Sequence, residues 1–231
     1  IRVAAMHCQD PSMIGFINDP KADYHKSVAA KVHGCKVEDI GDKDPRRTLA
    51  KTVSFAILYG GGPQRIADLV GIHLNEAQAF IKEYFEVFPK LREWIAETKI
   101  KAQRTKKTVS LFGRTRNIPD ADARNLGKRE RALRIATNAP IQADASDITL
   151  FSLNRVHRYL KKFKHADPSK SSALKASIHD SILLSVHQDD IDKIVRHIKF
   201  NILENTGLPF IEATGVLLRA DASWGHNWGE Q

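Results

Sequence analysis

The spacing of apolar and polar residues predicts helices over most of the first two thirds of the chain. Residues 45–59 are the clearest case, because Asp44 supplies an N-cap, Pro45 suits the first turn, and the glycines at 60–62 end the pattern. A kink is expected at Pro140, because proline cannot donate a backbone hydrogen bond. The same periodicity, caps and breakers predict further helices at residues 2–16, 24–34, 75–87, 90–106 and 128–163.

Two short apolar stretches in the last third, residues 174–178 and 182–186, predict a tight β-hairpin. His179, Asp180 and Ser181 would form its polar tip. Helices come first and a small antiparallel sheet with packed helices follows, so the expected fold class is α+β. The remaining elements expected are a short hairpin within 108–118, a loop over 166–172, a helix over 188–204 and a strand near 215–219.

Composition is that of a globular protein, with 42% apolar and 27% charged residues in 231. No apolar run approaches the roughly 20 residues of a membrane span, and residues 1–5 lack a signal-peptide pattern. Cys8 and Cys35 form neither a disulfide framework nor a CxxC spacing, which favours a reducing compartment. We therefore expect an intracellular location.

The net charge of +9 favours a polyanionic partner. Residues 99–134 contain twelve Lys or Arg against three acids, Asp120, Asp122 and Glu130. A solvated helical face is the simpler explanation of such a run. The excess without interleaved acids favours phosphate contacts.

One face of the helix predicted at 45–59 has the chemistry of a nucleoside triphosphate site. Arg47, Lys51, Phe55 and Tyr59 recur every four residues and therefore share a face. The two cations can pair with phosphate oxygens and neutralise a leaving pyrophosphate, and an aromatic ring can lie against sugar and base. An amphipathic surface helix is the alternative, which the complete pattern makes less favourable.

Residues 46–60 resemble motif B, R-x3-K-x3-F-x3-Y-G, of family A DNA polymerases of the bacterial DNA polymerase I type. The resemblance implies a fingers helix that closes on the incoming dNTP. Arg47 and Lys51 would bind its phosphates, with Lys51 also contributing to catalysis, while Phe55 would lie near the sugar and Tyr59 near the templating position.

The start of the chain is similar to the end of motif A of the same family and the residues after it. Ile1 and Arg2 resemble the last two residues of the motif, and Asp23, the expected N-cap of the helix at 24–34, precedes a further dNTP-binding candidate, His25. The motif A aspartate is absent, so the second main carboxylate is expected upstream or on another chain. An interrupted phage gene or a trimmed chain would produce such a boundary.

His179 and Asp180 at the predicted hairpin tip resemble motif C, His-Asp-Glu, with Ser181 in place of the auxiliary glutamate. The resemblance implies that Asp180 is a catalytic residue and a ligand of a two-Mg²⁺ centre, and that His179 contacts the primer terminus. A carboxylate on a tight turn is well placed to hold a metal ion.

Residues 134–147 resemble the palm helix R-x3-N-x-P-x-Q-G-x-A-A-D, with Ala143 for the glycine. Arg134, Asn138 and Gln142 share a four-residue step and could reach minor-groove acceptors that every base pair presents. Residues 111–120 resemble the Gly-Arg-Arg-x-x-x-Pro-Asp hairpin, in which Arg114, with Arg116, would meet template phosphates.

The resemblance implies fingers at 1–127, preceded by the tail end of motif A, and a palm at 128–231. The expected function is template-directed 5′–3′ DNA synthesis, with primer-template DNA, dNTPs and an N-terminal polymerase segment or subunit as partners and no membrane. The chain alone is expected to be inactive. The resemblance also implies the cytoplasm of a bacterial or phage-infected cell, with an organelle as an open alternative. Two alternatives are a fragment of a single-subunit RNA polymerase, which Phe55 and the 134–147 helix disfavour, and a non-catalytic primer-template-binding fragment.

Overall fold

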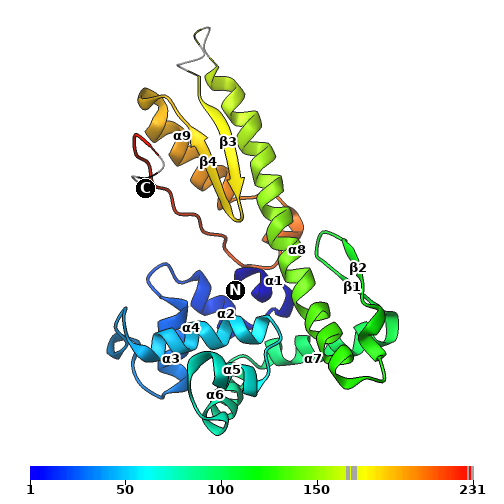
Figure 1. Ribbon diagram of the computed structural model, residues 1–231. Helices are drawn as coiled ribbons and strands as arrows, with labels where there is room; N and C mark the ends of the chain where they lie inside the picture. The colour runs from blue at the N-terminus through cyan, green and yellow to red at the C-terminus, as the bar shows by residue number, and fades with distance from the viewer. Residues whose placement is uncertain (165–166, 168–170, 228, 230–231) are drawn as a thin grey trace. The chain divides into compact units, whose positions relative to one another are not determined.

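The computed structural model describes residues 1–164, 167, 171–227 and 229, which pack as two compact units, Ile1–Asp144 and Ala145–Gln231 (Figure 1). The first unit is helical with one short hairpin, and the second combines a longer hairpin with helices. The α+β class is therefore confirmed. The packing boundary falls inside a long helix, and the fingers–palm boundary at 127/128 stays a prediction.

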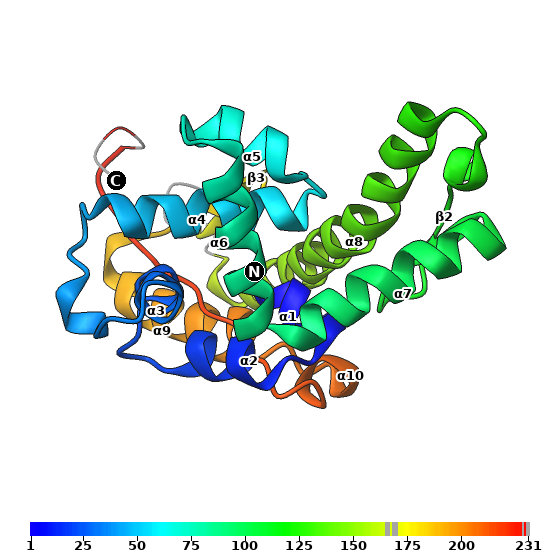
Figure 2. The same cartoon turned by 90° about the horizontal axis from the view of Figure 1, so that it is seen from below.

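The first unit is built almost entirely from helices. Its elements are α1 (Arg2–Cys8), α2 (Pro11–Asn18), α3 (Tyr24–Val32), η1 (Val37–Asp39), α4 (Pro45–Leu58), α5 (Pro63–Val70), α6 (Leu74–Val87), α7 (Pro89–Thr105), β1 (Lys107–Val109), β2 (Thr115–Asn117), η2 (Pro119–Asp122) and the first part of α8 (Leu126–Leu160). One small buried cluster joins α7, the η2 segment and the start of α8 (Figure 2); its members are Ala102, Ile118, Ala121, Ala132, Leu133 and Ala136.

The second unit contains the end of α8 and one antiparallel sheet of two strands. Its further elements are η3 (Lys161–Phe163), β3 (Ala173–Ile178), β4 (Ser181–Ser185), η5 (Gln188–Asp190), α9 (Ile191–Ile198), the π-helical turn η6 (Lys199–Leu203) and α10 (Pro209–Glu212). The apolar face of the hairpin, including Leu174, Ile182 and Leu184, packs on Val156 of α8 and Ile194 of α9. This packing supports the hairpin from one side.

Three sequence expectations need correction. Residues 2–16 form two helices, because Gln9 adopts a left-handed conformation and Asp10 then caps α2 ahead of Pro11. The helix expected over 188–204 is divided into η5, α9 and η6. Residues 215–219 form no strand, because they pair with no strand edge in the described part of the chain.

The sequence pattern does not predict helices α5 and α10, because both are short. The expected loop at 166–172 falls partly outside the described residues. In the described part of the chain, no helix has the length and apolar character that crossing a membrane requires.

Asp10 is a structural acid. Its side chain is fully buried and accepts hydrogen bonds from the backbone nitrogens of Met13 at 3.0 Å and Lys90 at 3.0 Å. It thus satisfies free backbone donors at the starts of both α2 and α7. This burial leaves Asp10 no role as a substitute for a metal-binding carboxylate.

Asp144 connects three segments of the first unit. Its buried carboxylate accepts hydrogen bonds from His7 Nε2 at 2.6 Å and from the backbone nitrogens of Leu111 at 3.0 Å and Phe112 at 3.2 Å. Burial raises the pKa of Asp144, but these hydrogen bonds lower it by a larger amount. The net result is a pKa below the ordinary value. The ionised carboxylate therefore holds α1 and the β1–β2 loop against α8.

Arg155 has a comparable role in the second unit. Its guanidinium donates to the carbonyl oxygens of Asn201 at 2.8 Å, Asn205 at 2.8 Å and Thr206 at 2.6 Å. Carbonyls at a helix end lack intrahelical donors and attract a cation. Arg155 therefore fixes the end of the α9–η6 helix against α8.

The β1–β2 hairpin is attached to α8 at its internal proline. Pro140 has no N–H to offer the carbonyl of Ala136, and the hydroxyl of Thr108 donates to that oxygen at 3.0 Å instead. The Thr108 side chain is buried, so water does not readily replace it. The sequence feature expected to disturb the helix thus creates the attachment point of the hairpin.

Replacing Thr108 by valine removes this donor and leaves a buried carbonyl unpaired. We expect Thr108→Val to lower the free energy of unfolding by about 1–3 kcal/mol. Thr115→Val, on the exposed strand β2, is the matched control and should change it by less than about 0.5 kcal/mol. Denaturant unfolding measures both, and equal effects would contradict the assigned hydrogen bond.

Candidate functional site

The face of α4 that carries the predicted triphosphate residues is open to solvent. Asp44 caps the helix by accepting from the backbone nitrogen of Arg46 at 2.8 Å, and the opposite face is buried. Lys51 is exposed, and Phe55 and Tyr59 are 39% and 56% exposed. Large aromatic side chains with this exposure are available to a ligand rather than used as core.

His25 lies beside this face because α3 packs against α4. Its ring centroid is 5.9 Å from that of Phe55. Burial lowers the pKa of His25 to about 4, and the charges of Arg47 and Lys51 lower it while Asp23 raises it. The imidazole is therefore neutral at neutral pH. The structure also brings four of the predicted dNTP-binding residues close together, namely His25, Arg47, Lys51 and Phe55.

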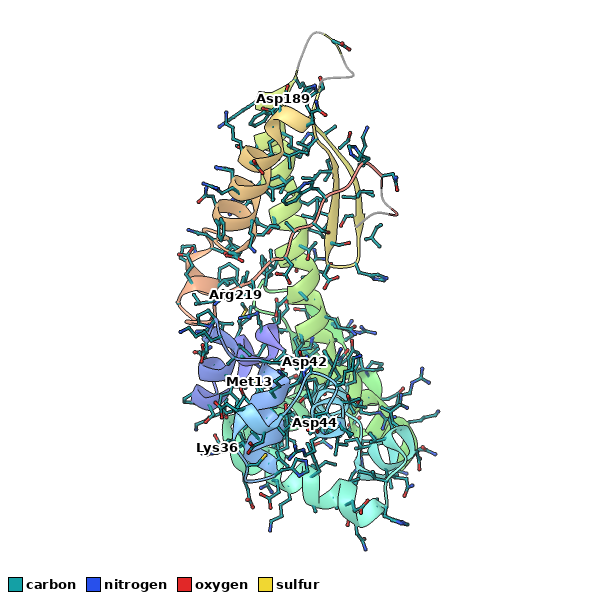
Figure 3. All side chains as sticks on the ribbon, turned by 90° about the vertical axis from the view of Figure 1, so that its left-hand side faces the viewer. Met13, Lys36, Asp42, Asp44, Asp189 and Arg219 are labelled. Atoms are coloured by element: carbon teal, nitrogen blue, oxygen red, sulfur yellow. The ribbon has the colours of Figure 1, made fainter. Side chains whose placement is uncertain are left out.

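Arg47 is paired with an acid that sequence reasoning treated only as a helix cap. Its Nη2 and Nε atoms donate to Asp23 Oδ2 at 2.6 and 3.0 Å. Asp42, in the loop before α4 (Figure 3), pairs with Lys26 at 2.6 Å and also accepts from Arg47 through its backbone oxygen at 3.4 Å. No local sequence signal indicates the Asp23–Arg47 pair, because it joins residues 24 positions apart.

The end of α4 rests on α8 at two of the predicted DNA-binding residues. The carbonyl of Leu58 accepts from Asn138 Nδ2 at 3.3 Å. Gly60 has a φ of 73°, and a Cβ built on it would lie 2.6 Å from Arg134 Cγ. Arg134 and Asn138 therefore contact the motif B helix, and their predicted reach to DNA stays a prediction.

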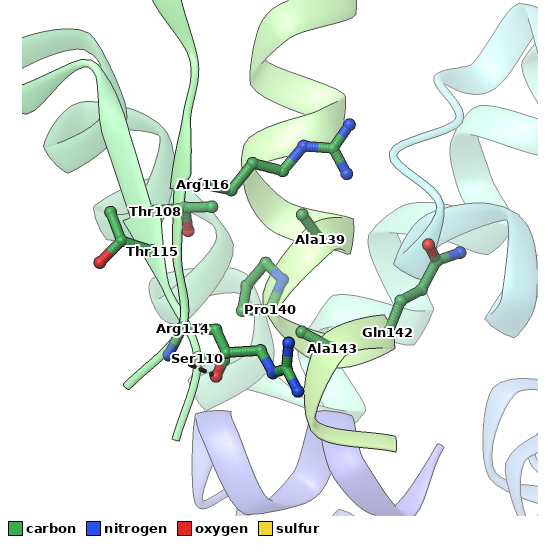
Figure 4. A pocket seen from close by; sticks show the side chains of 9 residues that line it. All are labelled: Thr108, Ser110, Arg114, Thr115, Arg116, Ala139, Pro140, Gln142 and Ala143. Atoms are coloured by element: carbon green, nitrogen blue, oxygen red, sulfur yellow. Dashed lines mark hydrogen bonds between the residues drawn. The ribbon is translucent and has the colours of Figure 1, made fainter. Parts of the chain in front are cut away.

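Arg114 and Gln142, the other predicted DNA contacts of the first unit, share a hollow between the β1–β2 hairpin and α8 (Figure 4). The hollow has a volume of about 310 Å³, and Arg114 is held there by a 3.2 Å bond from its backbone nitrogen to Ser110 Oγ. The residues lining it are Thr108, Ser110, Arg114, Thr115, Arg116, Ala139, Pro140, Gln142 and Ala143. Two guanidinium groups beside hydroxyls and an amide suit a phosphate-bearing ligand.

His179 and Asp180 form the two-residue loop of the β3–β4 hairpin in the second unit. Ile178 pairs with Ser181, so only these two residues make the turn, and His179 adopts a φ of 54°. A positive φ at the first loop position matches the twist that short hairpins require. Both side chains are exposed, and Ser181 Oγ donates to the Ile178 carbonyl at 2.9 Å.

Asp180 is not part of a larger cluster of possible metal ligands in the described part of the chain. Among the residues described, no group of three or more His, Cys, Asp or Glu could hold a metal ion. The predicted hairpin placement of Asp180 is confirmed, whereas its predicted metal ligation stays a prediction.

Gly60 offers a test of how closely α4 must approach α8. Gly60→Ala forces a Cβ into a left-handed backbone position and into Arg134, so we expect a loss of about 1–3 kcal/mol in unfolding free energy. Gly41→Ala, where a Cβ meets nothing within 4 Å and the backbone is ordinary, should be close to neutral. Thermal unfolding of both variants measures the difference, and a neutral Gly60→Ala would show that the contact is dispensable.

Known proteins resemble this chain over nearly its full length. The family described as DNA polymerase family A matches residues 1–230. The DNA polymerase of Bacillus phage SP01 is 33% identical over 217 residues, which cover 90% of this chain and 23% of that protein. The thermostable DNA polymerase I of Thermus filiformis is 33% identical over 232 residues, which cover 100% of this chain and 26% of that protein.

A solved structure shares the fold. The POL domain of Pol1 from M. smegmatis, in complex with DNA primer-template and dNTP, superposes with a TM-score of 0.80 at 24% identity, over 94% of this chain and 36% of that one. The chain spans about a quarter of the length of the two curated relatives above. Since the family match extends over residues 1–230, the chain belongs to DNA polymerase family A.

Proposed function

We propose that this chain provides the C-terminal fingers and palm part of a template-directed 5′–3′ DNA polymerase. The reaction is nucleotidyl transfer from a dNTP to a primer 3′-hydroxyl. The observation that supports it best is the exposed α4 face, on which two cations precede two aromatic rings beside a neutral histidine. The relatives come from bacteria and a bacteriophage, so we also propose the cytoplasm of such a cell as its location.

Different residues of α4 contact different parts of the dNTP. Arg47 and Lys51 bind the phosphates, and Lys51 stabilises the charge that develops on the leaving pyrophosphate. Phe55 lies against the sugar, and Tyr59, at the helix end, lies near the templating position. His25 is neutral at neutral pH and therefore contributes a hydrogen bond instead of a charge.

Primer-template DNA is the proposed partner of the basic residues on the hairpin and α8. Arg114 and Gln142 face one hollow that would take backbone phosphate, while Arg134 and Asn138 would read base-pair geometry through minor-groove acceptors. His179 would contact the primer terminus from the β3–β4 loop.

Family A DNA polymerases generally use Mg²⁺, and the exposed carboxylate of Asp180 is an oxygen ligand of the kind Mg²⁺ prefers. When bound, the two ions activate the primer hydroxyl and stabilise the leaving phosphate. Asp180 by itself does not complete a two-ion site among the described residues. In the proposed enzyme, the second main carboxylate therefore lies on polypeptide outside this chain.

This single carboxylate supports a second candidate function, primer-template binding without catalysis by the chain alone. Primer extension by the purified chain, and then by the chain supplied with the preceding polymerase polypeptide, separates the two candidates. Extension only in the second case supports the polymerase proposal, and extension by the chain alone would contradict the assignment of the missing carboxylate. The family match disfavours the RNA polymerase alternative, which a comparison of dNTP and NTP incorporation tests directly.

Asp180 should be essential for extension in the completed enzyme. We expect Asp180→Ala to lower the extension rate by roughly a thousandfold or more, because a metal-binding carboxylate is lost, while primer-template affinity stays within about twofold. Asp189→Ala, an exposed acid of the same unit, should extend normally. Normal extension by Asp180→Ala would remove Asp180 from the mechanism.

Lys51 should control the dNTP requirement. Loss of one charged contact to phosphate corresponds to about 1.5–3 kcal/mol, so we expect Lys51→Ala to raise the half-saturating dNTP concentration roughly ten- to a hundredfold. Lys82→Ala is the charge-matched control, because Lys82 lies on α6 and its ammonium pairs with exposed Glu86. Single-nucleotide incorporation measures both, and an unchanged requirement in Lys51→Ala would contradict the phosphate role.

A further inference from the structure

One carboxylate beside the α4 face has two separate tasks. Asp23 Oδ1 accepts from the backbone nitrogens of His25 at 2.8 Å and Lys26 at 3.0 Å, which caps α3. Asp23 Oδ2 accepts from Arg47 Nη2 at 2.6 Å and Nε at 3.0 Å. The cap and the ion pair therefore use different oxygens of the same group.

The ion pair occupies the part of Arg47 that phosphate would use. A guanidinium binds phosphate best with two adjacent N–H groups, and here the Nε–Nη2 edge is already donated to Asp23. The two side chains are 26% and 28% exposed, so a ligand from solvent can reach and displace the pair. Lys51, by contrast, has no carboxylate partner among the residues described.

Within the proposed nucleotide-binding role of α4, we propose that Asp23 competes with the incoming triphosphate for Arg47 and thereby sets the polyphosphate concentration needed to fill the site. Arg47 passes from the carboxylate to a phosphate oxygen when the ligand binds. Asp23 stays at the N-cap of α3 in both situations, so the position of His25 beside Phe55 does not depend on the exchange.

The surrounding charges are consistent with an exchange of Arg47 between Asp23 and a phosphate. Lys26 is engaged by Asp42 at 2.6 Å, which leaves Asp23 as the carboxylate that directly opposes Arg47. Burial raises the pKa of Asp23, but Arg47 and the backbone hydrogen bonds of the cap together lower it by more, so its pKa lies below the ordinary value. The carboxylate is therefore ionised at neutral pH and available as a competitor.

Asp23→Asn tests this inference cleanly, because asparagine is as good an N-cap as aspartate and keeps Oδ1 as an acceptor. The charge that opposes the ligand is lost, and an amide is a much weaker partner for Arg47. We expect inorganic triphosphate to bind Asp23→Asn about three- to tenfold more tightly than it binds the wild-type chain, as measured by calorimetry without DNA. The thermal midpoint should stay within about 3 °C of wild type, because the cap is preserved.

A double-mutant cycle assigns the gain to Arg47. In an Arg47→Ala background, Asp23→Asn should change triphosphate affinity by less than about twofold, because the contested guanidinium is gone. Asp68→Asn, which makes the same charge change on α5 and keeps an acceptor for Gln64, should leave affinity within about twofold. A gain of equal size in Asp68→Asn would show that net charge is responsible, and would overturn the inference.

The outcomes separate this inference from the proposed function. Triphosphate binding that Asp23→Asn leaves unchanged or weakens overturns the competition and leaves the polymerase proposal intact. Failure of every variant to bind triphosphate at millimolar concentration overturns the nucleotide-binding role and the competition together. The pair itself is checked independently by NMR titration of the Asp23 carboxyl, whose pKa should rise in Arg47→Ala; an unchanged pKa would show that the pair is absent.

Discussion

The contact between the end of α4 and helix α8 is the constraint on which the proposed nucleotide-binding face of α4 depends. Gly60 allows the two backbones to approach so closely that any side chain there would meet Arg134, and Asn138 donates to the last carbonyl of α4. Further along the same helix, Asp144 holds α1 and the β1–β2 loop. Arg134 and Asn138 thus attach the aromatic end of α4 to α8, and Asp144 attaches α1 and the β1–β2 loop to the same helix.

In the proposed nucleotide-binding role, this face of α4 combines groups that attract phosphate with one, Asp23, that opposes it. Lys51 stands free of acids in the described part of the chain, whereas Arg47 is shared with Asp23. Such a pair keeps a guanidinium ordered before a ligand arrives, which limits the entropy lost on binding, and in the proposed competition it also lowers the affinity for phosphate. His25 remains neutral next to both cations, because burial and their charges act in the same direction on its pKa.

In the second unit, the Asp180 carboxylate is carried by a hairpin that packs on two helices. Leu174 and Ile182 pack the hairpin on α8 and α9. Arg155 donates to the free carbonyl oxygens at the end of the α9–η6 helix. Asp180 then extends from a loop of only two residues. A short loop between paired strands has few alternative conformations, so the carboxylate is positioned by the backbone rather than by side-chain contacts.

The sequence by itself determined the helices with strong caps and breakers, the α4 face with its two cations and two aromatic rings, the hairpin with Asp180 at its tip, and the family resemblance. These features depend on residues within a few positions of one another, whose periodicity and turn chemistry act locally. Only the tertiary structure decided that Arg47 is paired with Asp23, that Thr108 replaces the donor missing at Pro140, and that residues 215–219 form no strand. Each of these depends on partners brought together from distant parts of the chain by packing, and local patterns carry no record of such partners.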